Sequence, residues 1–113
     1  KESLFRDIKD IITMQFENIE KRFNDFDTVM EEKLYNEVVL VVKSLDTMID
    51  HLDIVLKELP DILLLLNDLI PGRIKDLQEE YNNMVKMCKI TLQNVSPHVL
   101  AETLKCKLGD DRC

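Results

Sequence analysis

A regular apolar seam between residues 34 and 59 is the feature of this chain that most constrains its fold. Its spacings alternate between four and three residues, which is the heptad period of helices that pack along their length. The seam consists of Leu34, Val38, Val41, Leu45, Met48, Leu52, Val55 and Leu59. A second stripe of Val42, Ile49 and Leu56 widens it into a face suited to a globular bundle. The pattern therefore predicts a long amphipathic helix in an all-α protein.

Apolar residues at helical spacing predict further helices on either side of this seam. The first contains all four phenylalanines, so it should supply the aromatic part of the core. Its apolar positions are Phe5, Ile8, Ile12, Phe16, Ile19, Phe23, Phe26 and Met30. A later stretch has the same period, with Ile74, Leu77, Tyr81, Met84, Val85, Cys88, Leu92 and Val95. Two glycines and three prolines are too few turn formers for an all-β fold.

Capping residues and prolines predict where the helices begin and end. No Gly or Pro interrupts residues 1–59, so this stretch forms either one long helix or two. We favour a break within 24–30, because Asn and Asp compete there for backbone hydrogen bonds and Thr28 with Glu31 forms a capping-box pattern. Pro60, Pro71-Gly72 and Ser96-Pro97 mark the remaining boundaries.

The resulting prediction is a small antiparallel bundle of four to five helices in one domain, residues 1–113. Its helices are expected over about 3–25, 28–59, 60–70, 72–95 and 97–107. Gly109 is a natural stop after the last of them.

Three cysteines, Cys88, Cys106 and Cys113, lie in the last quarter of the chain. Cys88 and Cys106 stand eight or nine residues to either side of Ser96-Pro97, so an antiparallel hairpin there would bring them to matching heights. We therefore expect a Cys88–Cys106 disulfide that links a C-terminal helical hairpin. Pairings with Cys113, or three buried free thiols, remain alternatives. With that bridge, Cys113 would be unpaired or would join two chains in a dimer.

Charge and motif content indicate a non-enzymatic protein without nucleic-acid partners. The net charge is −7, and an acidic chain repels phosphate backbones. The longest apolar runs, 38–42 and 62–66, are too short to span a membrane. No phosphate loop, nucleophile elbow or zinc helix is present, and neither His51 nor His98 has metal-ligand spacing. We expect no cofactor and no metal site.

Three surface features each have a functional and an ordinary interpretation. Asn94-Val95-Ser96 has the form of a glycosylation sequon, although Pro97 directly after it makes occupancy doubtful. A hairpin at residues 96–97 would bring four lysines together into a basic patch. The ordinary interpretation is that these lysines are scattered surface charges. They are Lys86, Lys89, Lys105 and Lys107. The leucine-rich run 62–66 has three interpretations: a helix buried at the centre of the bundle, an exposed apolar patch that binds a partner, or the lining of a ligand cavity.

The chain resembles the small helical salivary proteins of anopheline mosquitoes, the family of albicin and anophensin. The resemblance lies in three segments: the opening Lys-Glu-Ser-Leu-Phe-Arg-Asp-Ile-Lys-Asp-Ile-Ile, the expected hairpin around Ser96-Pro97, and the ending Lys-Cys-Lys-Leu-Gly-Asp-Asp-Arg-Cys. It covers the whole chain, but the family has no short diagnostic motif, so no binding residue is transferred to positions here.

The resemblance implies a secreted, extracellular protein that inhibits the host alternative complement pathway by binding its convertase, a plasma protein complex. The absence of an initiator Met indicates either a processed mature chain or a trimmed one, and the cysteine content favours the processed extracellular chain. Two alternatives are inhibition of contact activation and kinin release, and a helical adaptor that oligomerises through the 34–59 seam.

Overall fold

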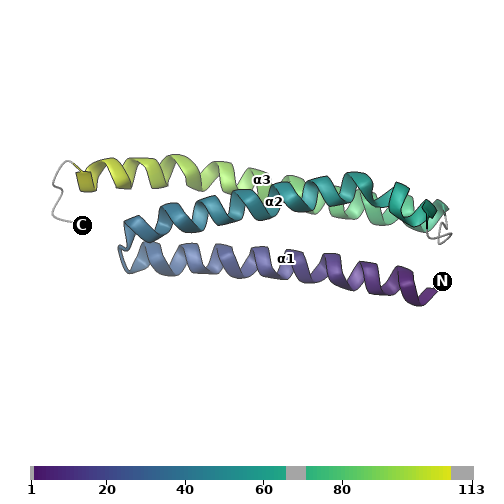
Figure 1. Ribbon diagram of the computed structural model, residues 1–113. Helices are drawn as coiled ribbons and strands as arrows, with labels where there is room; N and C mark the ends of the chain where they lie inside the picture. Colours follow the sequence, from purple (N-terminus) through teal and green to yellow (C-terminus); the bar gives the residue numbers. More distant parts are fainter. Residues whose placement is uncertain (1, 66–70, 108–113) are drawn as a thin grey trace.

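The computed structural model describes residues 2–65 and 71–107, and these form three α-helices joined end to end in alternating directions (Figure 1). The helices are α1 (Glu2–Glu31), α2 (Tyr35–Leu65) and α3 (Pro71–Lys107). The all-α class is therefore confirmed for the described residues, and the predicted number of four to five helices is not. Residues 66–70, Gly109 and Cys113 lie outside the described part of the chain.

The three helices form an elongated body of 60 × 19 × 17 Å. Its radius of gyration is 17.9 Å, whereas a compact domain of this length would have about 13 Å. Helix α2 lies close to both α1 and α3 along their lengths. Among the described residues, no Cα of α1 comes within 8 Å of a Cα of α3. Contact between the two outer helices therefore depends on long side chains.

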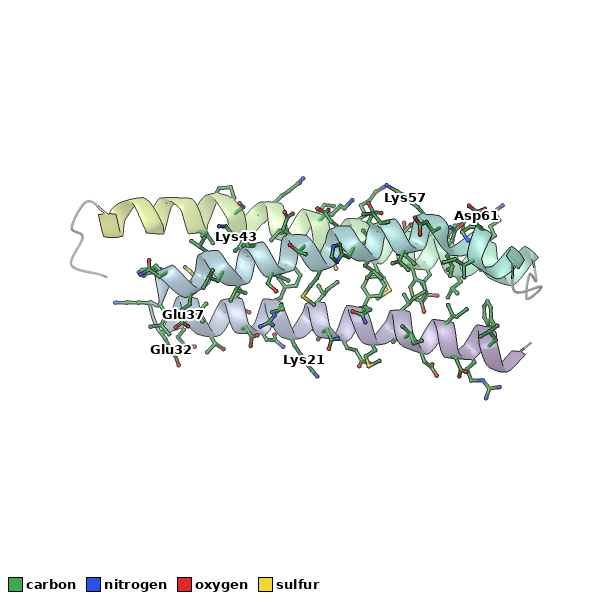
Figure 2. The ribbon with its side chains drawn as sticks, viewed as in Figure 1. Lys21, Glu32, Glu37, Lys43, Lys57 and Asp61 are labelled. Carbon is green, nitrogen blue, oxygen red and sulfur yellow. The ribbon has the colours of Figure 1, made fainter. Side chains whose placement is uncertain are left out.

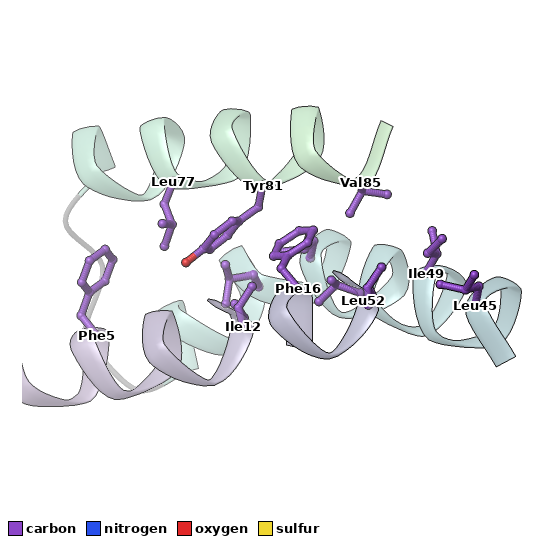
Figure 3. Packing of buried hydrophobic residues seen from close by; sticks show 12 residues of the cluster. Phe5, Ile12, Phe16, Leu45, Ile49, Leu52, Leu77, Tyr81 and Val85 are labelled. Carbon is purple, nitrogen blue, oxygen red and sulfur yellow. The ribbon is translucent and has the colours of Figure 1, made fainter. Parts of the chain in front are cut away.

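Two apolar clusters form the core. The larger one is drawn from all three helices (Figure 3). Its buried members are Phe5, Ile12, Phe16, Ile19, Leu45, Ile49, Leu52, Leu56, Leu59, Leu77, Tyr81 and Val85. The smaller cluster joins Phe26, Val38 and Val99 near the turn between α1 and α2. The charged side chains labelled in Figure 2, such as Lys21 on α1 and Lys57 on α2, extend away from these clusters.

The predicted seam is buried inside the chain itself, together with the stripe beside it. Leu45 and Leu56 have no exposed surface, and Ile49 is only 1% exposed. Helix α2 packs against α1 on one side and α3 on the other. A single heptad seam would contact only one of these helices, so α2 uses both apolar stripes. Leu34 and Val55, at 40% and 43% exposure, are the two seam positions left open to solvent.

The predicted helix break within 24–30 is wrong, because α1 continues to Glu31. The Thr28 hydroxyl donates to the carbonyl oxygen of Asn24 at 3.1 Å, so it does not cap a new helix. Asp25 accepts from Arg22 at 3.1 Å one turn earlier. Phe26 is buried in the smaller cluster. Local hydrogen bonds and this buried ring together keep the segment helical.

The chain reverses instead at residues 32–34, through a Schellman motif. The Leu34 amide donates to the carbonyl of Val29 at 2.9 Å, and the Lys33 amide donates to that of Met30 at 3.1 Å. Lys33 takes the left-handed conformation that this motif requires, with φ of 60°. The Leu34 carbonyl then accepts from the Glu37 amide at 2.9 Å and begins α2. Lys33 thus ends α1, and Leu34, the next residue, starts α2.

Replacing Lys33 with glycine should stabilise the protein by about 0.5–1 kcal/mol, because a side chain in the left-handed region is strained and glycine is not. The Lys33→Gly variant should unfold at higher urea concentration with an unchanged slope. Lys43→Gly, in the exposed interior of α2, is the control and should lose roughly 1 kcal/mol. Destabilisation by Lys33→Gly would contradict the assigned turn geometry.

The predicted boundary at Pro60 is also wrong, since α2 runs through this residue to Leu65. Proline has no amide hydrogen, so it cannot donate to the carbonyl of Leu56 four residues earlier. The Gln78 side chain from α3 supplies that donor instead, with its Nε2 atom 2.9 Å from the Leu56 oxygen. The hydrogen bond between helices therefore compensates for the missing bond within α2.

The expected hairpin at Ser96-Pro97 is absent, because α3 is one helix from Pro71 to Lys107. Val95 and Val99, on either side of Pro97, both pack into the smaller cluster and hold the helix in line. Cys88 and Cys106 consequently lie on the same helix, separated by about 27 Å along its axis. A disulfide needs Cα atoms about 4.4–6.8 Å apart. The continuous helix keeps these two residues apart, so the predicted bridge is not confirmed.

Candidate protein-binding grooves

An open groove of about 610 Å³ lies between α1 and α3. We call it the α1–α3 groove. Its lining residues are Thr13, Phe16, Glu17, Ile19, Glu20, Phe23, Asn83, Met84, Met87, Cys88 and Thr91. The groove exists because both outer helices pack on α2 and their backbones stay apart. Its floor is aromatic and aliphatic, and its edges carry the polar groups.

Tyr81 is the side chain that connects the two outer helices at one end of this groove. It is 2% exposed and reaches from α3 toward α1, where its ring lies beside Phe16 with the centroids 5.5 Å apart (Figure 3). Its hydroxyl donates to the carbonyl oxygen of Lys9 at 3.2 Å and lies 3.2 Å from the Thr13 hydroxyl. Burial raises the pKa of Tyr81, so the phenol stays protonated and can keep donating.

The two walls of the α1–α3 groove differ in chemistry. The α1 wall carries Glu17 and Glu20, and these are the only charged groups among the described side chains that line the groove. The α3 wall presents two methionines, Met84 at 37% and Met87 at 63% exposure. Methionine is flexible and polarizable, which suits surfaces that adapt to a partner. The groove is therefore apolar, adaptable and negatively charged along one rim.

Cys88 lies in this groove as a free, half-buried thiol. Burial raises its pKa, so the reactive thiolate is scarce at neutral pH. No metal-binding group of three or more His, Cys, Asp or Glu side chains occurs within the described residues. The side chain of Cys106 lies outside the described part of the chain.

A second groove, of about 670 Å³, lies between α2 and α3 near the smaller cluster. Its lining residues are Val39, Val42, Lys43, Gln93, Ser96, Pro97 and Val99. Lys43 is its charged group among the described side chains, and Figure 2 shows it on the α3 side of α2. The two grooves thus lie along different flanks of α3 and have opposite charge.

Asp53 on α2 anchors an ion-pair network across to α3. One oxygen of its carboxylate accepts from Lys89 at 2.7 Å and lies 3.3 Å from the Lys57 ammonium. The hydrogen bond from Lys89 is the main reason that the pKa of Asp53 falls below its ordinary value of 3.8. The same bond raises the pKa of Lys89 above 10.5. The pair is consequently ionised on both sides throughout the neutral range.

The Asp53–Lys89 pair should stabilise the fold between pH 3.8 and pH 10.5, and its contribution should decline outside that range. A lowered Asp pKa contributes stability above 3.8 that is lost as the pH falls below it, and a raised Lys pKa contributes stability that is lost above 10.5. Asp53→Asn should therefore cost up to about 1 kcal/mol at pH 7, because Lys89 is partly exposed and screened.

The check is urea unfolding of both proteins at pH 7 and at pH 3. The difference in unfolding free energy should shrink at pH 3, whereas Asp7→Asn, on the exposed face of α1, should change little at either pH. An Asp53→Asn effect that is equal at the two pH values would contradict an ionic contribution.

The structure does not gather the four lysines of the predicted basic patch. Without the hairpin, Lys89 and Lys105 stand about 24 Å apart along α3, and Lys89 is engaged by Asp53. Asn94 is exposed within α3, and His51 is exposed on α2. Of the leucine-rich run 62–66, residues 62–65 form the end of α2, and Ile62 is 37% exposed. The side chains of residues 63–65 and of His98, and Leu66 itself, lie outside the described part of the chain.

Comparison with protein-family models, curated proteins and solved structures found no match to this chain. None of the helices, over the residues the structure describes, combines the length and apolarity needed to cross a membrane. The fold defines an elongated antiparallel three-helix bundle whose outer helices leave an apolar groove between them.

Proposed function

We propose that this chain is a secreted, non-enzymatic protein that inhibits the host alternative complement pathway by binding its convertase through a protein surface. The resemblance of its terminal segments to the albicin and anophensin family supports the choice of target. The structural observation that supports a binding role is the α1–α3 groove, where exposed methionines flank an apolar floor. Contiguous apolar surface within a groove is a feature of protein-interaction and ligand-binding sites.

Inhibition of contact activation and kinin release is the alternative within the same class, because it also needs only surface binding. The adaptor alternative has less support. Most of the 34–59 seam that it would use for oligomerisation is buried within the chain, where Leu45 and Leu52 pack against α1 and α3. A helix that uses its seam internally cannot offer the same residues to a second copy.

The proposal is tested by haemolysis assays restricted to the alternative or the classical pathway, alongside a contact-activation assay. We expect inhibition of the alternative pathway at micromolar protein or below, and none of the classical pathway. Inhibition of contact activation alone would favour the kinin alternative. No inhibition in any of the assays would overturn the proposed function.

A further inference from the structure

We propose that the α1–α3 groove is a docking site for a basic amphipathic helix of a partner protein. The inference rests on the proposed function in one respect only, that the chain acts by binding another protein. It does not depend on which cascade that protein belongs to.

The dimensions of the groove suit a helix. Thr13 and Phe23 mark its ends on α1, and this separation of ten residues spans about 15 Å. A guest helix of about ten residues has the same length. Because α2 already packs on both outer helices, a guest lying between α1 and α3 would complete a four-helix arrangement around the core.

The floor and the α3 wall suit an apolar helix face. Phe16 and Phe23 contribute rings from α1, and Met84 and Met87 contribute flexible side chains from α3. Helices that bind in grooves insert apolar anchors at i, i+3 or i+4, and i+7, and methionine-lined walls adapt to such anchors. Met87, at 63% exposure, is the most exposed of the large apolar side chains that line the groove.

The charged groups that line the groove determine which charge a bound helix should carry. Glu17 and Glu20 lie on the α1 wall, whereas the polar groups of the α3 wall, Asn83 and Thr91, are neutral. A guest with Lys or Arg beside its apolar face would pair with these carboxylates. The net charge of −7 argues against a second copy of this chain as the guest, and against an anionic membrane surface.

The binding test uses three synthetic 14-residue helical peptides that share one leucine face. Their flanking positions carry Lys and Arg, Gln, or Glu. We expect the basic peptide to bind most tightly and the acidic peptide most weakly, with the difference shrinking as salt is raised. No binding of any peptide at millimolar concentration, or equal binding of all three, would overturn the proposal. Binding to anionic vesicles in preference to the basic peptide would also overturn it.

Matched protein variants then locate the contact. The double variant Glu17→Gln/Glu20→Gln should weaken the basic peptide about tenfold, as expected for two partly exposed ion pairs. Glu58→Gln/Glu79→Gln changes the net charge equally at exposed positions outside the groove, so it should change binding by less than about twofold. Equal weakening by the two variants would show that only net charge matters, and would reject the site.

Cys88 provides a second readout that does not depend on charge. In a Cys106→Ser/Cys113→Ser background, saturating basic peptide should slow alkylation of the Cys88 thiol at least fivefold, because this thiol lines the groove. An unchanged rate at saturation would place the peptide elsewhere and reject the groove.

Failure of this inference and failure of the proposed function are distinguishable. If the basic peptide docks as expected but no cascade is inhibited, the groove proposal stands and the complement proposal falls. If complement is inhibited equally by the wild type and the Glu17→Gln/Glu20→Gln variant, and no peptide binds, the function stands without this site.

Discussion

Substitution of Tyr81 by alanine should destabilise the protein by about 3–5 kcal/mol, the usual cost of removing a fully buried aromatic ring. The ring packs on Phe16, and its hydroxyl binds the Lys9 carbonyl. Since the backbones of the outer helices do not approach each other, this side chain carries much of the attachment of α1 to α3. We therefore expect the loss of stability to be concentrated where α1 contacts α3.

The companion variant Tyr81→Phe separates the ring from the hydroxyl. It keeps the packing and removes the hydrogen bonds, so it should cost about 1 kcal/mol, the net value of a typical hydrogen bond. Urea unfolding followed by circular dichroism gives both values. In hydrogen exchange, Tyr81→Ala should accelerate amides of α1 around Lys9 and Phe16 more than those of α2. A cost below about 1 kcal/mol for Tyr81→Ala would contradict its role as the connecting side chain.

The core was predictable from sequence because burial follows helical phase. Positions such as Phe16, Ile49 and Leu77 repeat at the period of a helix, and each one is buried. Phase gives the face of a helix that turns inward, but not the distance between two helices. The α1–α3 groove depends on that distance. The sequence did not signal it: Met84 belongs to the predicted apolar stripe of α3 and yet is 37% exposed, and Met87 lies beside that stripe.

Helix ends were less predictable, because the chain breaks the local rules that locate them. The reversal at Lys33 uses a left-handed lysine where the usual signal is glycine. A weak signal was present. The apolar spacing slips to four, four and four across Phe26, Met30, Leu34 and Val38, and this slip spans the true turn. Conversely, Pro60 and Pro97 look like breaks and are not, because contacts from other helices hold the backbone in place.

The hydrogen bond from Gln78 to Leu56 leads to the second large expected effect. Leu56 is completely buried, so its carbonyl oxygen cannot turn to water when the Gln78 amide is removed. Gln78→Met keeps the length of the side chain and deletes the donor. We expect a loss of about 1–3 kcal/mol in the free energy of unfolding, the cost of leaving a buried acceptor unsatisfied.

A double-mutant cycle with Pro60→Ala tests whether Gln78 acts by compensating for the proline. An alanine at position 60 has an amide hydrogen that can donate to the Leu56 carbonyl within α2, so Gln78→Met should then cost less than about 1 kcal/mol. Pro60→Ala alone should stabilise the protein, since it restores the bond within the helix. The coupling between the two substitutions measures the compensation directly. An equal cost of Gln78→Met in both backgrounds would mean that α2 tolerates Pro60 for a reason unrelated to this bond.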